Sequence, residues 1–278
     1  MSKICRALKN IFTGKGSRPA YATISFLMTI APNECLYVYV FDEKWSVAVN
    51  ILLNKLVASL AIFTIFRVAS GIIHICKKKV SLIWDDYKVI IEYGNLIEVK
   101  DGMKVISFDE CFTSKIGDAP NEIKETSVCG QYLIKNKDII IDDIIQEARI
   151  KPLRGKSAYR GLTKYEPGTS VLFNGDLLMA FAKLDENGRA YMSYEDYLKC
   201  LNKMWEEVNN YHGTRDVYIP VLGSLLTQFD KSLTQQQLVD TILDSYRLSP
   251  YKLKNPFKLH IVCKRREGFD INEVWGVK

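Results

Sequence analysis

The fold is decided by the stretch Val217-Tyr218-Ile219-Pro220-Val221-Leu222-Gly223-Ser224. Its first five residues are mostly β-branched or aromatic and predict a buried strand, and the glycine and serine predict a loop. A strand that ends in such a loop leaves backbone N–H groups unpaired, and open α/β sheets bind phosphates at this edge. Gly223 and Ser224 are therefore candidate phosphate contacts, with Leu225 and Leu226 as apolar walls. The alternative is an ordinary strand-to-loop transition.

Apolar runs of strand and helix length alternate on both sides of this segment, from residue 80 to residue 278. Strands are expected over residues 84–91, 103–108, 170–173, 177–184 and 257–263. Helices are expected over residues 137–149, between Ser193 and Gly213, and after Thr234. Ser193 with Asp196, and Thr234 with Gln237, have the spacing of helix capping boxes. This alternation predicts a three-layer α/β/α domain with a mixed sheet.

The basic residues are unevenly distributed, although the formal net charge of the 278 residues is only +6. Five lysines and arginines precede Glu34, the first acidic residue, and Lys77, Lys78 and Lys79 form a second cluster. Basic clusters that flank apolar segments favour anionic lipid head groups over nucleic acid. We therefore expect a lipid bilayer as a partner and no nucleic acid, the alternative being solvated termini.

The seven cysteines lie far apart and form no C-x-x-C pair, which indicates free thiols in a reducing compartment. The sequence also contains neither a spaced Cys/His metal set nor a Ser-His-Asp arrangement. No catalytic residue, metal ligand or cofactor is therefore assigned. We expect a cytoplasmic domain that holds a phosphorylated ligand in preference to transforming it.

Two apolar stretches, residues 20–41 and 45–76, are separated by the charged link Asp42-Glu43-Lys44. Crossing a bilayer takes roughly 20 apolar residues, a length that both stretches reach by including polar groups. With positive charge on both outer flanks, they predict a transmembrane hairpin of two helices within residues 1–79, both ends cytoplasmic. The alternative is a soluble helical hairpin packed against the domain of residues 80–278.

Polar residues inside the second stretch would be costly in lipid, so Asn50, Asn54 and Lys55 are expected to face a partner helix or an aqueous path. A single hairpin is too small to form a pore. We therefore expect homo-oligomers.

Five short motifs occur in a fixed order over residues 88–263: YGNLI (93–97), VISFDECF (105–112), SVCGQY (127–132), YEPGT (165–169) and YIPVLGS (218–224). Their order resembles that of macrodomains, which bind ADP-ribose and related nucleotides. It is more similar to the divergent macrodomain of membrane-anchored effectors in the Thoeris anti-phage defence system. The preceding apolar hairpin fits the same architecture.

The resemblance implies a function. In such systems a TIR-domain enzyme makes a nucleotide signal from NAD, and the effector's macrodomain captures it. In this branch of the family the ligand is an ADP-ribose derivative conjugated to histidine. Capture makes the membrane segments disrupt the bilayer. The resemblance thus implies a ligand-gated effector, not an enzyme, in the bacterial inner membrane with its macrodomain in the cytoplasm.

The resemblance also implies site residues. Asn95 stands where many macrodomains have an aspartate that accepts a hydrogen bond from adenine, and it keeps the acceptor without the charge. Asp109 and Glu110 would bind ribose hydroxyls or the amino group of the ligand, unless they are exposed loop carboxylates. The remaining candidates are Phe112, at the end of the same motif, and Gly130 and Gln131, whose N–H groups would hold the second phosphate.

Two alternatives remain at this point. The chain is a membrane-tethered ADP-ribosyl or phosphoester hydrolase with Asp109 or Glu110 as general base, or it is a scaffold without a ligand. The Asn-Ala-Ala-Asn loop of hydrolytic macrodomains is replaced near these carboxylates, which favours the effector. The basic loop with Arg154, Lys156, Arg160 and Lys164 would either be solvated or close over the phosphates.

Overall fold

The computed structural model describes residues 46–84, 86–224 and 227–274. The chain divides into two units, residues 1–77 and residues 78–278, and each is described by itself. The sequence placed this boundary after residue 79. Lys79 is the first residue of strand β1 (Lys79–Trp84), so the sheet begins slightly earlier than expected.

The first unit contains the long helix α3 (Val47–Cys76), capped by the Ser46 side chain, which accepts a hydrogen bond from the Val49 amide. Its segment Val47–Ala69 is 23 residues long and apolar enough to cross a membrane. The Ser59 hydroxyl donates to the Lys55 carbonyl within the helix, so it needs no partner from outside. The second apolar stretch thus forms one continuous helix. The first stretch, residues 20–41, lies outside the described residues, and the two-helix hairpin stays a prediction.

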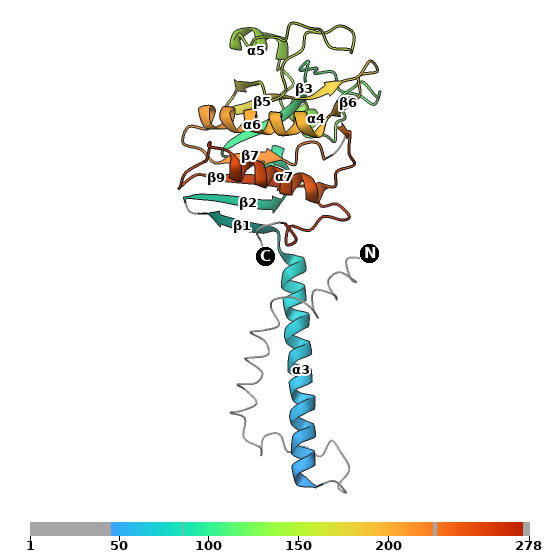
Figure 1. Cartoon of the computed structure of the whole chain (residues 1–278), viewed down its shortest axis with the longest axis vertical. Helices are drawn as coiled ribbons and strands as arrows, with labels where there is room; N and C mark the ends of the chain where they lie inside the picture. The colour runs from blue at the N-terminus through green and yellow to red at the C-terminus, as the bar shows by residue number, and fades with distance from the viewer. Residues whose placement is uncertain (1–45, 85, 225–226, 275–278) are drawn as a thin grey trace. The chain divides into compact units, whose positions relative to one another are not determined.

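A nine-stranded mixed sheet forms the centre of the second unit (Figure 1). Its spatial order is β1-β2-β9-β7-β3-β5-β6-β8, with β4 beside β5. The strands after β1 are β2 (Tyr87–Tyr93), β3 (Met103–Asp109), β4 (Ser170–Phe173), β5 (Asp176–Leu184), β6 (Ala190–Met192), β7 (Val217–Pro220), β8 (Gln228–Phe229) and β9 (Lys258–Cys263). Neighbours from β2 to β5 in this order are parallel, whereas β1, β4 and β6 pair antiparallel with β2, β5 and β5.

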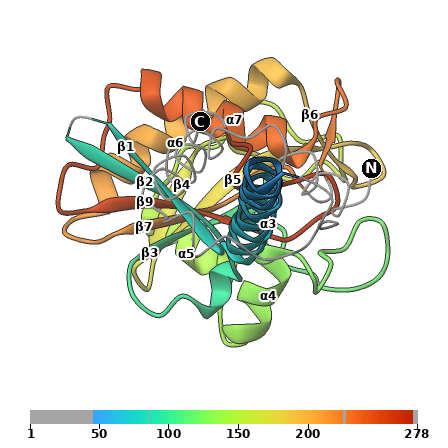
Figure 2. The ribbon, with the colours of Figure 1, turned by 90° about the horizontal axis from the view of Figure 1, so that it is seen from below.

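Helices cover both faces of this sheet, as predicted (Figure 2). They are α6 (Tyr194–Tyr211) and α7 (Gln235–Leu248) on one face, and α4 (Val128–Lys135) and α5 (Ile141–Ala148) on the other. Strand β9 shows why two cores form, because its side chains alternate: Ile261 joins the core with α6 and α7, and Val262 joins the core with α4 and α5. On the first face Trp205 packs on Tyr246, and its indole N–H donates to the Ser245 hydroxyl at 3.1 Å.

Several local expectations differ from the structure. The strand expected over residues 84–91 is a hairpin of β1 and β2, in which Trp84 pairs with Tyr87. The helix expected over residues 137–149 begins only at Ile141. The Thr234–Gln237 capping box is complete, but at Ser193 only half of the box forms, because the Asp196 carboxylate binds the Lys183 ammonium at 2.7 Å.

The path of the chain opens a crevice at the carboxyl ends of two adjacent strands. From β3 the chain leads to α4 on one face of the sheet, and from β7 it leads to α7 on the opposite face. Because β3 and β7 are neighbours, their connections diverge above the sheet edge. A crevice at such a switch point is the usual ligand site of open α/β sheets.

Candidate functional site

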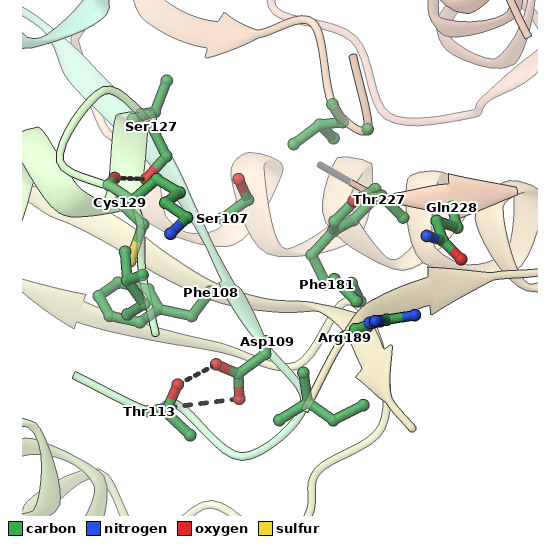
Figure 3. A pocket seen from close by; sticks show the side chains of 18 of the residues that line it. Ser107, Phe108, Asp109, Thr113, Ser127, Cys129, Phe181, Arg189, Thr227 and Gln228 are labelled. Atoms are coloured by element: carbon green, nitrogen blue, oxygen red, sulfur yellow. Dashed lines mark hydrogen bonds between the residues drawn. The ribbon is translucent and has the colours of Figure 1, made fainter. Parts of the chain in front are cut away.

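A cavity of about 350 Å³ lies at this crevice (Figure 3). Its floor comes from the carboxyl ends of β3, β5 and β7, and its walls come from the loop of residues 113–124, the start of α4, the β5–β6 turn and the start of β8. Apolar groups such as Phe108 and Phe181 alternate with polar ones such as Ser107 and Thr227. This mixture suits a ligand with both aromatic and charged parts.

The loop after β7 lines the cavity through Gly223 and Ser224, where the sequence predicted phosphate contacts. Gly223 has a φ of +78°, and the ring of Phe229 lies directly against its Cα, 2.5 Å from where a Cβ would be. The Ser224 amide donates to the Val221 carbonyl at 3.3 Å, whereas the Gly223 amide makes no hydrogen bond to any described residue. Of the two predicted donors, the glycine is therefore the one available to a ligand. Leu225 and Leu226 lie outside the described residues.

Asp109, the last residue of β3, also lines the cavity. Its carboxylate accepts hydrogen bonds from the Cys111 amide at 2.8 Å, the Thr113 amide at 3.3 Å and the Thr113 hydroxyl. Burial nevertheless raises the pKa of this carboxyl above its ordinary value, because the loss of water outweighs these hydrogen bonds. Asp109 is thus not the exposed loop carboxylate of the alternative interpretation.

Glu110 and Phe112 do not line the cavity, so their expected ligand contacts are corrected. Glu110 is only 4% exposed, and its Oε1 accepts from the Ser157 hydroxyl at 2.6 Å and from the Leu184 amide at 3.3 Å. Phe112 is buried in the core under α4 and packs edge-on against Tyr165. Consecutive residues of an extended chain point to opposite sides, which explains why Asp109 faces the cavity and Glu110 faces the protein.

Asn95, Gly130 and Gln131 also lie outside the cavity lining. The Asn95 carbonyl oxygen accepts from the Ile97 amide and caps the short 3-10 helix η2 (Leu96–Glu98), and its amide nitrogen donates to Gln131 at 2.9 Å. Gly130 and Gln131 are inside α4, where their amides donate to the Ser127 hydroxyl and carbonyl. These three residues therefore hold the helix in place, and their amides are not free for a phosphate.

Gly130 has a packing reason to be glycine. A Cβ at this position would lie 2.2 Å from the Lys124 carbonyl oxygen, which lines the cavity wall from the preceding loop. The absence of a side chain thus lets α4 approach that loop.

Two cations after β9 hold the rims of the cavity. The Lys264 ammonium donates to the Thr126 carbonyl at 2.9 Å, beside the start of α4, and the Arg266 guanidinium donates to the Ser224 carbonyl. Both rims are therefore tied to the end of one strand.

The wall formed by Arg189, Thr227 and Gln228 was not predicted. Arg189 comes from the β5–β6 turn. Gln228 is the first residue of β8, a strand of two residues that has no recognisable periodicity, and Thr227 is the residue before it. The basic loop with Arg154, Lys156, Arg160 and Lys164 does not line the cavity, which agrees with the alternative of a solvated loop.

The raised pKa of Asp109 predicts a pH-dependent stability. The pKa of Asp109 is higher in the folded state than in the unfolded state. Its contribution to the free energy of unfolding is therefore fully present below its ordinary pKa of 3.8, and this contribution is lost as the pH rises through the folded-state pKa. Asp109→Asn keeps the acceptor for Cys111 and removes the buried charge. We expect its unfolding midpoint to exceed that of the wild type at about pH 8 and this gain to shrink towards about pH 4.

Thermal unfolding scans across this range measure the effect. Asp138→Asn is the matched control, because Asp138 is exposed. Equal pH profiles for the wild type and Asp109→Asn would contradict a raised pKa of this carboxyl.

Residues 89–264 match the family described as Thoeris protein ThsA, Macro domain. The Thoeris protein ThsA of Bacillus amyloliquefaciens (strain Y2) is 30% identical over 200 residues, which cover 66% of this chain and 65% of that protein. The match thus spans just under two thirds of the relative's length.

Solved structures with a similar fold include a mutant Oceanobacillus iheyensis macrodomain with ADPR, at 8% identity and a TM-score of 0.43 over 68% of this chain and 91% of that chain. The macrodomain of Thermus aquaticus DarG is 11% identical with a TM-score of 0.39, over 63% of this chain and 97% of that chain.

Proposed function

Because this chain belongs to the macro-domain family of the Thoeris protein ThsA, we propose that it is an anti-phage defence effector that binds an ADP-ribose-derived signal. The observation that carries this proposal is the cavity at the ends of β3, β5 and β7, with the uncommitted Gly223 amide at its floor. A pyrophosphate suits such an amide, and the apolar lining suits a base or ribose. The proposed signal is histidine-conjugated ADP-ribose made by a partner TIR-domain enzyme.

Calorimetric titration of the full chain in detergent tests this function. We expect saturable binding of ADP-ribose and of its histidine conjugate. The absence of heat from both ligands at tens of micromolar would overturn the proposal and favour a scaffold without a ligand.

We propose that the first unit anchors the effector in the cell membrane and disrupts it after signal capture. The support is the apolar segment Val47–Ala69, with the basic cluster Lys77–Lys79 following the helix on the proposed cytoplasmic side. The chain should stay in the membrane pellet after a carbonate wash. Release into the soluble fraction would contradict the anchor and favour the soluble hairpin.

Bilayer disruption would need several copies, since one or two helices cannot enclose a pore. We therefore propose a homo-oligomer that the ligand promotes or rearranges. Mass photometry in detergent should detect species larger than a monomer, and monomers alone with and without ligand would contradict this step.

A hydrolase remains the second candidate, because Asp109 lines the cavity and a carboxyl with a raised pKa suits a general base. We favour the sensor, since both oxygens of this carboxylate already accept hydrogen bonds from Cys111 and Thr113. A labelled ADP-ribosylated peptide should stay intact on long incubation. Turnover that is lost in Asp109→Ala would establish the hydrolase instead.

A further inference from the structure

Arg189 lines the cavity, and its guanidinium has no partner among the described residues. Two cationic side chains, Arg189 and Lys124, are among the described residues that line it. The Lys124 ammonium is occupied, because it donates to the carbonyls of Asp118 and Ala119 and lies 3.8 Å from the Asp118 carboxylate. The Arg189 guanidinium makes no hydrogen bond or ion pair within the described ranges. A free guanidinium at a cavity wall favours an anionic group of the ligand.

The backbone under Arg189 is held firmly, although its side chain is exposed. The Asp185 carboxylate accepts from the Asn187 amide at 2.9 Å and from the Arg189 amide at 2.8 Å, which closes the β5–β6 turn. Gly188 supports the same turn with a φ of +78°. Arg189 is therefore presented from a fixed position, and Figure 3 shows it beside Gln228 on the cavity wall.

The cavity thus offers two separate features for negative charge. The Gly223 amide lies at the end of β7, and the Arg189 guanidinium lies on the β5–β6 turn. One pyrophosphate accounts for the first feature. The second feature fits a further anionic group of the ligand, such as a carboxylate.

We propose that Arg189 is the specificity-determining residue of this cavity and binds the carboxylate of the amino acid that the nucleotide signal carries. The inference rests on the proposed function. Its guanidinium fork matches a carboxylate in a bidentate manner, and a lysine cannot reproduce this geometry.

Calorimetry of the full chain in detergent with three ligands tests the inference: ADP-ribose, its histidine conjugate, and the histamine conjugate, which lacks only the carboxylate. For Arg189→Gln we expect the Kd of the histidine conjugate to rise by about tenfold or more, and the Kd values of the other two ligands to stay within about twofold. Arg189→Lys should lie between the wild type and Arg189→Gln. Arg154→Gln, an exposed arginine outside the cavity, is the matched control and should change none of the three.

Each other outcome overturns the inference. Equal weakening of all three ligands would assign Arg189 to the pyrophosphate, and no weakening of any would remove it from the site. Wild-type binding of ADP-ribose without binding of the histidine conjugate would reject the carboxylate subsite while nucleotide binding stands. Wild-type binding of no ligand would reject the proposed function itself.

Discussion

Replacing Gly223 by valine is expected to weaken nucleotide binding by about 100-fold or more, a loss of roughly 2.7 kcal/mol. The backbone at Gly223 has a φ of +78°, which a β-branched residue adopts only with strain. Its Cβ would also lie 2.5 Å from the Phe229 ring, so the loop after β7 must move. The Gly223 amide, which makes no hydrogen bond to any described residue, would move with it. Calorimetric titration with ADP-ribose measures the loss, and thermal unfolding verifies that the variant is folded.

Gly213→Val is the matched control for this variant. Gly213 has a similar φ of +59°, but no atom lies within 4 Å of its Cβ position, and it does not line the cavity. The control therefore imposes backbone strain without displacing the site and should retain wild-type affinity. Tight binding by Gly223→Val, or equal losses in both variants, would show that the loop after β7 is not the phosphate contact.

The substitution Glu110→Ala removes a buried carboxylate and is expected to lower the free energy of unfolding by roughly 3 kcal/mol. The Ser157 hydroxyl and the Leu184 amide would lose their acceptor in a region closed to water. The backbone bonds of Glu110 to Ala182 and Tyr165 remain in the variant, so the loss reports on the side chain alone. The loss should appear as a lower denaturant midpoint with an unchanged slope.

Glu110→Gln separates this structural role from catalysis. Glutamine keeps an oxygen for Ser157 and Leu184, so most of the stability should return. A hydrolase that used Glu110 as its base would lose turnover in this variant while staying folded. A stable Glu110→Ala protein would contradict the buried network described here.

The parts of the fold that could be predicted are those with long, regular patterns. Strand β5 contains the apolar run of residues 177–182, β9 is mostly apolar, and α6 and α7 have caps and one apolar stripe. The sequence placed Gly130 and Gln131 between a loop and a helix, but α4 already begins at Val128. Their N–H groups therefore donate to Ser127 within the first turn of the helix and are not free for a phosphate.

The site was predictable only in part for a related reason. A sequence shows that Asp109 and Glu110 end a strand, but the bends of the backbone decide which carboxylate faces the cavity. Gly223 was found because a glycine after an apolar strand is a strong local signal. Arg189 was missed, since it enters the cavity through pairing between β6 and β8, two strands too short to recognise.

The two cations after β9 have a consequence for how the cavity opens. Lys264 and Arg266 are only two positions apart, and they donate to backbone oxygens on two rims of the cavity, one beside the start of α4 and one in the loop after β7. The same short segment after β9 thus restrains both rims. An outward movement of one rim therefore pulls on the other. We expect the two rims to move together, so that a ligand bound to one rim also changes the position of the other.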